Sequence, residues 1–458
     1  MTHHRYPGQT LRTSLRLAAA AILIAGTVLL GAGRSANAQG LPLIRDTEIE
    51  NLLNDYSRPL FRAAGLGEGR VAIRIVRSDV FNAFVLDGRN VFVHTGALMT
   101  ANTPNEIIGV IAHESGHITG GHLAALRARI ARDQTKALLI RMLGLGVAIA
   151  TGQGAAMLAG DELIMRSLLA ERRQQESAAD QAGLKVLNAT KQSGQGMLAT
   201  FERFAQQEYI SDAQKDAFVR SHPVAADRLA QLRDLVEHSP YLSTKDSAQL
   251  QLRHDMMRAK LAGYLERPQI VFNRYPPSDT SMPARYGRAI ARFMQGGPNG
   301  LTSALADIDG LIRERPDNAY FHELKADFLV RSGLNREAIA PLRQALRLAG
   351  EANLIRVQLG AALLATNDPA VVIEAVELLR KSLIEDENPR AYRELANAYY
   401  RQGKQPEAEA ATAQAYFLEG DVKQAQFTAK RSQRGLRQGS PAWIKMDDII
   451  TYKLESEL

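Results

Sequence analysis

Hydrophobic residues recur along the chain with two periods, and each period predicts a different kind of element. In the first half, spacing of three and four residues predicts amphipathic helices over residues 41–64, 107–126, 170–189, 198–207 and 225–235. Strict alternation predicts a strand over Val71–Val76. Two short runs, residues 82–86 and 91–94, flank a glycine turn and predict a hairpin. The first half is therefore expected to surround a small β-sheet with helices.

The second half, from about residue 284, predicts one helix after another, with small residues at repeated offsets. The two matching sets are Ala326, Ala338 and Ala345, and Ala396, Ala408 and Ala415. This pattern resembles the tetratricopeptide repeat, whose paired helices need small residues where they cross closely. The resemblance covers about residues 284–437 and suggests four repeats, with three extra residues near Asn367–Val371. An ordinary helical bundle is the alternative.

The first residues read as a secretory signal peptide. Arginines precede an apolar run over residues 17–32, and Ala36-Asn37-Ala38 supplies the small residues that signal peptidase needs, so cleavage is expected after Ala38. A permanent membrane anchor is the alternative, but the run is short for a spanning helix. Because residues 1–38 carry four arginines and no acid, they account for most of the formal charge of +7. Nothing in the charge pattern predicts nucleic-acid binding.

Two further stretches bear on how the chain is organised. Residues 142–160 are almost uncharged, but their glycines interrupt a helix, so we expect a buried helical hairpin or a surface loop in peripheral contact with a membrane. Between about His238 and Pro283 the hydrophobic pattern weakens and prolines accumulate, which predicts loops and an interdomain connection. The chain has no cysteine, so disulfides and thiolate metal sites are excluded.

The strongest chemical signal is His113-Glu114-Ser115-Gly116-His117 inside a predicted helix. Residues at i and i+4 share one helical face, so both imidazoles can reach one metal ion while Glu114 faces a water on it. A catalytic zinc needs a third protein ligand and an open position. Glu176 and Asp180, again four residues apart, can supply a ligand and a hydrogen bond that orients a ligand histidine. Taken alone, this pair would read as a solvated acidic face.

These motifs resemble a known family. Asn82-Ala83-Phe84, the zinc helix, Glu176 with Asp180, and Ser221-His222-Pro223 with Arg228 occur in the order seen in the HtpX-like zinc metallopeptidases of peptidase family M48. The predicted signal peptide and repeats place the chain nearest the BepA-like periplasmic group. The resemblance implies one Zn2+ per chain held by His113, His117 and Glu176, with Glu114 as general base. It also implies Asp180 behind the ligands, His222 and Arg228 facing the metal, and a substrate-binding edge strand over Asn82, Ala83, Phe84 and Val85.

Two of these residues have more than one interpretation. Arg228 or His222 could stabilise the oxyanion that develops during peptide hydrolysis, and a surface salt bridge is the alternative for Arg228. In the group that the chain resembles, the matching histidine approaches the metal, so His222 could instead close the site as a fourth ligand. Five other histidines match no ligand spacing; they are His94, His122, His238, His254 and His322. We expect His122 to be structural.

The predicted fold is mainly α (α+β): a zincin-type metalloprotease domain with a small sheet, followed by an α-solenoid. The expected segments are a signal peptide of residues 1–38, a protease domain of residues 39–265, a linker of residues 266–283 and a repeat domain of residues 284–458. The predicted function is a periplasmic zinc endopeptidase that supervises misassembled outer-membrane proteins, with repeats that bind the assembly machinery. The alternative is a chaperone-like adaptor with a largely latent site. Substrates, cleavage specificity and oligomeric state do not follow from the sequence.

Overall fold

The structure is a computed structural model that describes residues 41–67, 69–86, 88–125, 128, 156–205, 217–223, 226–350 and 352–453. The predicted signal peptide lies outside these ranges, as does most of the uncharged stretch, residues 142–155. Across the described ranges, every helix is too short or too polar to cross a membrane.

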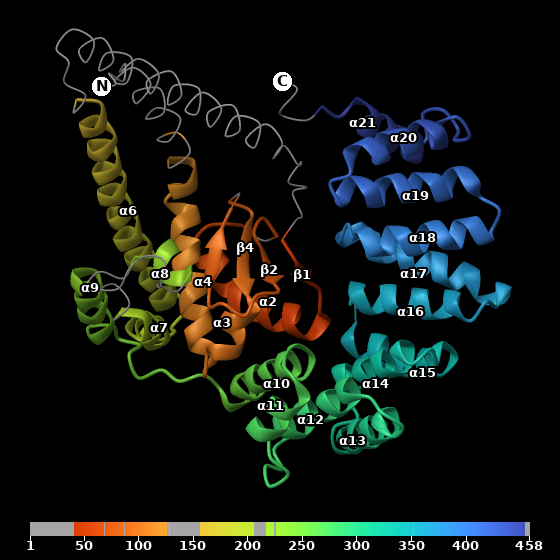
Figure 1. The fold of residues 1–458 in the computed structure, drawn as a ribbon, viewed down its shortest axis with the longest axis horizontal. Coiled ribbons are helices and arrows are strands. Elements are labelled where there is room, and N and C mark those ends of the chain that lie inside the picture. Colours follow the sequence, from red (N-terminus) through yellow and green to blue (C-terminus); the bar gives the residue numbers. More distant parts are fainter. Residues whose placement is uncertain are drawn as a thin grey trace, which may run out of the picture. The chain divides into compact units, whose positions relative to one another are not determined.

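A four-stranded mixed sheet lies near the start of the described chain (Figure 1). Its strands run in the order β1 (Leu43–Ile44), β2 (Ala72–Val76), β4 (Asn90–His94) and β3 (Ala83–Val85). The predicted strand is β2, and the predicted hairpin is the antiparallel pair β3 and β4. Because β2 and β4 pair in parallel, β3 lies at the edge of the sheet. One face of the sheet is buried, as the alternation predicts.

Helices cover that face, and the other elements of the first half are helices as well. They are α2 (Thr47–Ala63), α3 (Thr95–Thr100), α4 (Pro104–Thr119), α6 (Ala156–Ala189), α7 (Gln195–Ala205), α8 (Ala217–Ser221) and α9 (Ala226–Glu237). Several predicted boundaries differ from the structure, among them the starts of α6 and α7, and two of the differences have a clear physical cause. The first helix begins later than residue 41, because Leu43–Ile44 pairs with β2 and Asp46 caps the helix at the amide of Ile49. The metal-motif helix ends at Thr119, because Gly121 turns the chain with a φ of 62°.

The predicted loop region between residues 238 and 283 contains two helices, α10 (Ala248–Leu265) and α11 (Pro268–Arg274). The prediction of loops there was wrong for a physical reason. Met257 and Leu261 of α10 pack into the core of the first half, whereas Met256 packs with Tyr286 and Phe321 of the second half. A helix buried on two sides has no single apolar stripe, which is the signal that sequence periodicity detects.

The second half is an array of antiparallel helix pairs that follow one another (Figure 1). The helices are α12 (Met282–Gln295), α13 (Gly300–Glu314), α14 (Ala319–Arg331), α15 (Asn335–Ala349), α16 (Asn353–Ala365), α17 (Val372–Glu385), α18 (Pro389–Arg401), α19 (Gln405–Leu418), α20 (Val422–Gln433) and α21 (Pro441–Thr451). The predicted small residues Ala326, Ala338 and Ala345 are buried in its core. The predicted extra residues form a 3-10 turn, Pro369–Val371, between α16 and α17.

Candidate metal centre

Helix α4 holds the central motif and lies unusually close to α6. Proline occupies the first turn of α4, where its missing N–H costs nothing, and the helix then runs through His113 and His117 on one face. A side chain at Gly116 would place its Cβ 2.6 Å from the carbonyl oxygen of Ala179 in α6. The absence of that Cβ lets the helices approach until Glu176 and Asp180 of α6 face the two histidines.

Four side chains converge at this contact. Ligand atoms of His113, His117, Glu176 and His222 all lie within 4.8 Å of one another. Nε2 of His113 is 3.1 Å from Nε2 of His117 and 3.4 Å from Oε2 of Glu176, and Nε2 of His117 is 3.4 Å from Oε1 of the same carboxylate. The three predicted metal-binding side chains therefore meet at one point, with His222 as a fourth.

Glu114 lies beside this cluster. Its carboxylate is buried, and Oε1 makes no hydrogen bond to the described part of the chain. Nε2 of His222 approaches that oxygen at 3.3 Å. A buried carboxylate oxygen without a hydrogen bond is costly, so the arrangement favours a polar or ionic occupant beside it.

Asp180 and Arg228 form a buried pair behind the cluster. Nδ1 of His113 lies 2.9 Å from Oδ1 of Asp180, which leaves Nε2 of the imidazole directed at the convergence point. Arg228 grips Asp180 with Nε and Nη2, and its Nη1 reaches Oε2 of Glu176 at 3.1 Å and the carbonyl of Pro223 at 2.8 Å. Only 5% of Arg228 is exposed, so the surface salt bridge considered for this residue is excluded.

The charges of these groups follow from this packing. Burial lowers the pKa of His113, but hydrogen bonds to Asp180 and Glu176 outweigh it and raise that pKa to about 9. Burial raises the pKa of Glu176, yet the neighbouring His222, His113 and His117 bring it well below its usual range. For Asp180, burial is again opposed by the hydrogen bonds from Arg228 and His113, and the net pKa is lowered. Both carboxylates are thus held as anions.

His222 stands directly after the short helix α8 and reaches back across the cluster. Its Nδ1 is 3.1 Å from Oε2 of Glu176 and 3.2 Å from Nε2 of His113, while its Nε2 is 3.2 Å from the carbonyl oxygen of Ala83. The ring packs against Phe218, with centroids 5.1 Å apart. His222 therefore contacts both the convergence point and the edge of the sheet.

The predicted substrate-binding segment, Asn82 to Val85, borders the cluster and consists of Asn82 followed by strand β3. The carbonyl of Asn82 accepts a hydrogen bond from the amide of His94 in β4, so the backbone groups of the next residue, Ala83, point away from the sheet. The side chain of Asn82 accepts a hydrogen bond from Ser221 at 3.1 Å, which ties the strand to the segment before His222. Phe84 stacks on Phe92 of β4.

One contact was missed by sequence reasoning. His122 was expected to be structural, but its Nδ1 lies 3.0 Å from Nδ1 of His117. The available signal was its position five residues after His117, directly beyond Gly120-Gly121. His94, His238, His254 and His322 instead contact backbone carbonyls away from the cluster.

The donor set fits a divalent metal ion. Three imidazoles and one carboxylate supply nitrogen and oxygen ligands of the kind that zinc binds in hydrolases, and the chain has no thiolate to compete. Such donors repel one another through their lone pairs unless protons or a cation lie between them. Asp180 contacts Nδ1 of His113, and His122 contacts Nδ1 of His117, which are positions where metal-binding histidines commonly have hydrogen-bond partners.

Comparison with known proteins matches residues 44–236 to Peptidase family M48. The Beta-barrel assembly-enhancing protease of Escherichia coli (strain K12) is 25% identical over 432 residues, which cover 89% of this chain and 84% of that protein. The protein of the same name from Yersinia pestis is 23% identical and covers 84% of this chain and 79% of its own length.

Two other matches cover less of the chain. Metalloprotease LoiP of Escherichia coli (strain K12) is 28% identical over 36% of this chain and 62% of its own. Among solved structures, MamA MSR-1 C2 aligns with 38% of this chain at 18% identity and a TM-score of 0.31. The family match coincides with the segment that builds the cluster of His113, His117 and Glu176. Residues 44–236 are therefore a peptidase family M48 domain, and the chain is a metalloendopeptidase.

Proposed function

We propose that this metalloendopeptidase uses one zinc ion, held by His113, His117 and Glu176, to hydrolyse peptide bonds in misassembled envelope proteins of the periplasm. The observation that carries this proposal is the convergence of these three side chains beside the buried carboxylate of Glu114. Three protein ligands leave zinc a further position, as a hydrolase requires.

When bound, the metal supplies Lewis acidity, which acidifies water and polarises the scissile carbonyl. Glu114, as general base, takes the proton from the attacking water and returns it to the leaving amine. Oε1 of Glu114 makes no hydrogen bond within the described part of the chain and lies 3.3 Å from Nε2 of His222, beside the cluster, which suits this role. Asp180 and Arg228 keep His113 oriented, and the four engaged contacts of Arg228 favour positioning over direct oxyanion binding.

The edge strand β3 offers the place where a substrate backbone would bind. An extended peptide can add to an exposed sheet edge through main-chain hydrogen bonds. The outward carbonyl of Ala83 lies next to the cluster, so a peptide paired there would pass in front of Glu114. Asn82, Ala83, Phe84 and Val85 would align the substrate in this proposal.

Relatives named beta-barrel assembly-enhancing proteases motivate the substrate class. We propose that this chain acts likewise on outer-membrane proteins during assembly, after export and cleavage behind Ala38. Peripheral membrane contact through residues 142–160 belongs to the same proposal. The alternative function is a chaperone-like adaptor with a largely latent site. The specific observation in its favour is His222, which occupies the cluster and the edge-strand carbonyl together.

Metal analysis and cleavage of an unfolded protein test the enzymatic proposal. Glu114→Gln should retain one zinc per chain, because Glu114 is not a ligand, and should lose cleavage by about 10²-fold or more, since it removes the base. Glu237→Gln, on the exposed surface of α9, is the matched control and should cleave as the wild type does. Equal cleavage by the wild type and Glu114→Gln would sink the mechanism.

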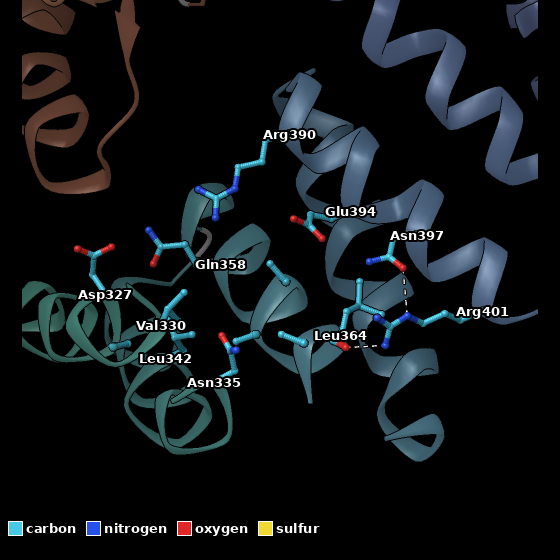
Figure 2. Close-up of a pocket in the computed structure, with 14 residues that line it drawn as sticks. Asp327, Val330, Asn335, Leu342, Gln358, Leu364, Arg390, Glu394, Asn397 and Arg401 are labelled. Carbon is cyan, nitrogen blue, oxygen red and sulfur yellow. Dashed lines mark hydrogen bonds between the residues drawn. The ribbon is translucent and has the colours of Figure 1, made fainter. Parts of the chain in front are cut away.

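The repeats contain a polar groove that suits partner binding (Figure 2). Its cavity of about 270 Å³ is lined by residues of α14, α15, α16 and α18, including Asp327, Gln358, Arg390, Glu394 and Asn397. Among the described residues, Arg390 has no ion-pair partner and reaches into the groove (Figure 2). Concave surfaces of stacked helix pairs commonly hold extended segments of other proteins.

Charge reversal at this groove tests the binding proposal. Arg390→Glu should weaken cross-linking to an unfolded β-barrel protein several-fold, because it places a second carboxylate beside Glu394. Arg437→Glu, on the exposed turn between α20 and α21, makes the same charge change outside the groove. If both variants cross-link alike, the groove is not the partner site. Zinc content is expected to stay the same in both.

A further inference from the structure

A turn at Gly120-Gly121 holds His122 against Nδ1 of His117. Helix α4 ends at Thr119, and Gly121 adopts a φ of 62°, a conformation that side chains rarely tolerate. A Cβ on Gly120 would lie 2.3 Å from Nε2 of His122. Gly121 therefore allows the turn, and Gly120 leaves room for the ring of His122, which folds back over the end of the helix.

The contact between His122 and His117 involves one specific atom of His117, its Nδ1. Nε2 of His117 faces the convergence point, 3.4 Å from Oε1 of Glu176, and its other nitrogen, Nδ1, faces Nδ1 of His122 at 3.0 Å. The two rings stand nearly perpendicular, with an interplanar angle of 81°. This edge-on arrangement suits an N–H donated by one ring to the lone pair of the other.

The tautomers follow once His117 binds a metal through Nε2. A neutral imidazole that coordinates through one nitrogen carries its proton on the other, so Nδ1 of His117 becomes the donor and Nδ1 of His122 the acceptor. In His113 the corresponding nitrogen, Nδ1, faces a different partner, the carboxylate of Asp180. Each helical histidine thus has its own partner behind it, one charged and one neutral.

We infer that His122 is a positioning residue for the metal site, which fixes the ring of His117 by accepting the hydrogen bond from its Nδ1. This inference rests on the proposed metal-binding role of His117. It adds a residue that neither the motif nor the ligand cluster contains. Partners of this kind typically change metal affinity by about 10- to 100-fold when they are removed.

Zinc affinity of the full chain, measured by competition with a chelator, tests the inference. His122→Phe keeps a ring and removes the acceptor, and it should weaken zinc binding by about 10- to 100-fold. His122→Asn places a carbonyl oxygen near the position of Nδ1 and should recover most of that loss. His238→Ala, on a side chain that is 77% exposed, is the control and should bind zinc as the wild type does. The absorption bands of the cobalt-substituted proteins should change in His122→Phe and return toward the wild type in His122→Asn.

Three outcomes separate the possibilities. Unchanged zinc affinity in His122→Phe overturns the inference. An equal loss in His122→Phe and His122→Asn overturns it too, because an acceptor restored at this position would then not restore zinc binding. His113→Ala tests the site itself and should bind zinc far more weakly than any His122 variant. If His113→Ala binds zinc as well as the wild type, the proposed metal site fails independently of His122.

Discussion

At the scale of single residues, the cluster depends on side chains that serve two partners at once. Asp180 shares its oxygens between an imidazole and a guanidinium. Glu176 lies against four side chains, those of His113, His117, His222 and Arg228. Buried charges are tolerated only where they are paired and hydrogen-bonded. Because each group satisfies another, the cluster is a connected unit in which one replacement leaves a second group unpaired.

The role of His222 distinguishes a site that this histidine blocks from one that is open to substrate. Nδ1 of His222 contacts the carboxylate of Glu176, and its Nε2 contacts the carbonyl oxygen of Ala83, with which a substrate backbone would need to pair. If His222 closes the site, His222→Ala should retain zinc and raise cleavage of an unfolded protein, including self-cleavage. If it is an oxyanion donor, cleavage should fall by about 10² or more. Because both contacts block substrate, we expect the rise.

The comparison is made at equal zinc content, which is measured before each assay. His254→Gln is a poor control because that histidine is buried, so the exposed His238→Ala is used instead. A large loss of activity in His222→Ala, with zinc retained, would rule out the closing role and assign His222 to the transition state.

At the scale of elements, the sequence predicted what short-range patterns encode. The strand β2, the hairpin of β3 and β4, and the helix bearing His113 and His117 follow from periodicity and turn chemistry. Helix α10 did not follow, because it is buried on two sides and shows no single apolar face. The spacing of Glu176 and Asp180 predicted that they share one helical face, but the contacts of His122 and Arg228 depend on tertiary packing that residue spacing does not reveal.

Gly116 tests the close approach of α4 and α6. In Gly116→Ala the new Cβ would lie 2.6 Å from the carbonyl oxygen of Ala179, so one helix must shift. We expect a loss of about 1–3 kcal/mol in the free energy of unfolding, and weaker zinc binding because Glu176 moves with α6. Chemical denaturation and chelator competition measure the two effects.

A helical glycine with more room provides the matched control. A Cβ at Gly310 in α13 would meet no atom closer than 3.5 Å. Gly310→Ala should therefore be neutral or stabilise the protein by up to about 1 kcal/mol, because alanine favours helix more than glycine does. If Gly116→Ala is equally harmless, the tight contact does not set the geometry of the cluster.

At the scale of the whole molecule, a buried polar network joins the start of the protease region to the repeats. Nζ of Lys260 in α10 lies 2.8 Å from Asp46 and 3.1 Å from Glu48, and the hydroxyl of Tyr286 donates to Glu48. Glu323 of α14 accepts hydrogen bonds from Thr47 and Gln358. With no cysteine in the chain, this junction depends on noncovalent contacts.

Glu323 makes that junction sensitive to pH. Burial raises the pKa of its carboxyl to about 7, although the ammonium of Lys260 opposes the rise. Its Oε2 has no hydrogen-bond partner within the described residues. Because the folded state holds this proton more tightly than the unfolded chain, whose carboxyl titrates near 4.5, its contribution to stability is complete below about pH 4.5. That contribution is lost as the pH rises through about 7.

Glu323→Gln should remove this dependence. The amide keeps an acceptor for Thr47 and Gln358 and cannot ionise, so the variant should be more stable than the wild type at pH 8 by about 1–3 kcal/mol, and the difference should shrink toward pH 5. Denaturation curves at several pH values measure it. Glu337→Gln, on the exposed surface of α15, should follow the wild type throughout. A Glu323→Gln curve parallel to that of the wild type from pH 5 to 8 would show that Glu323 does not govern the junction.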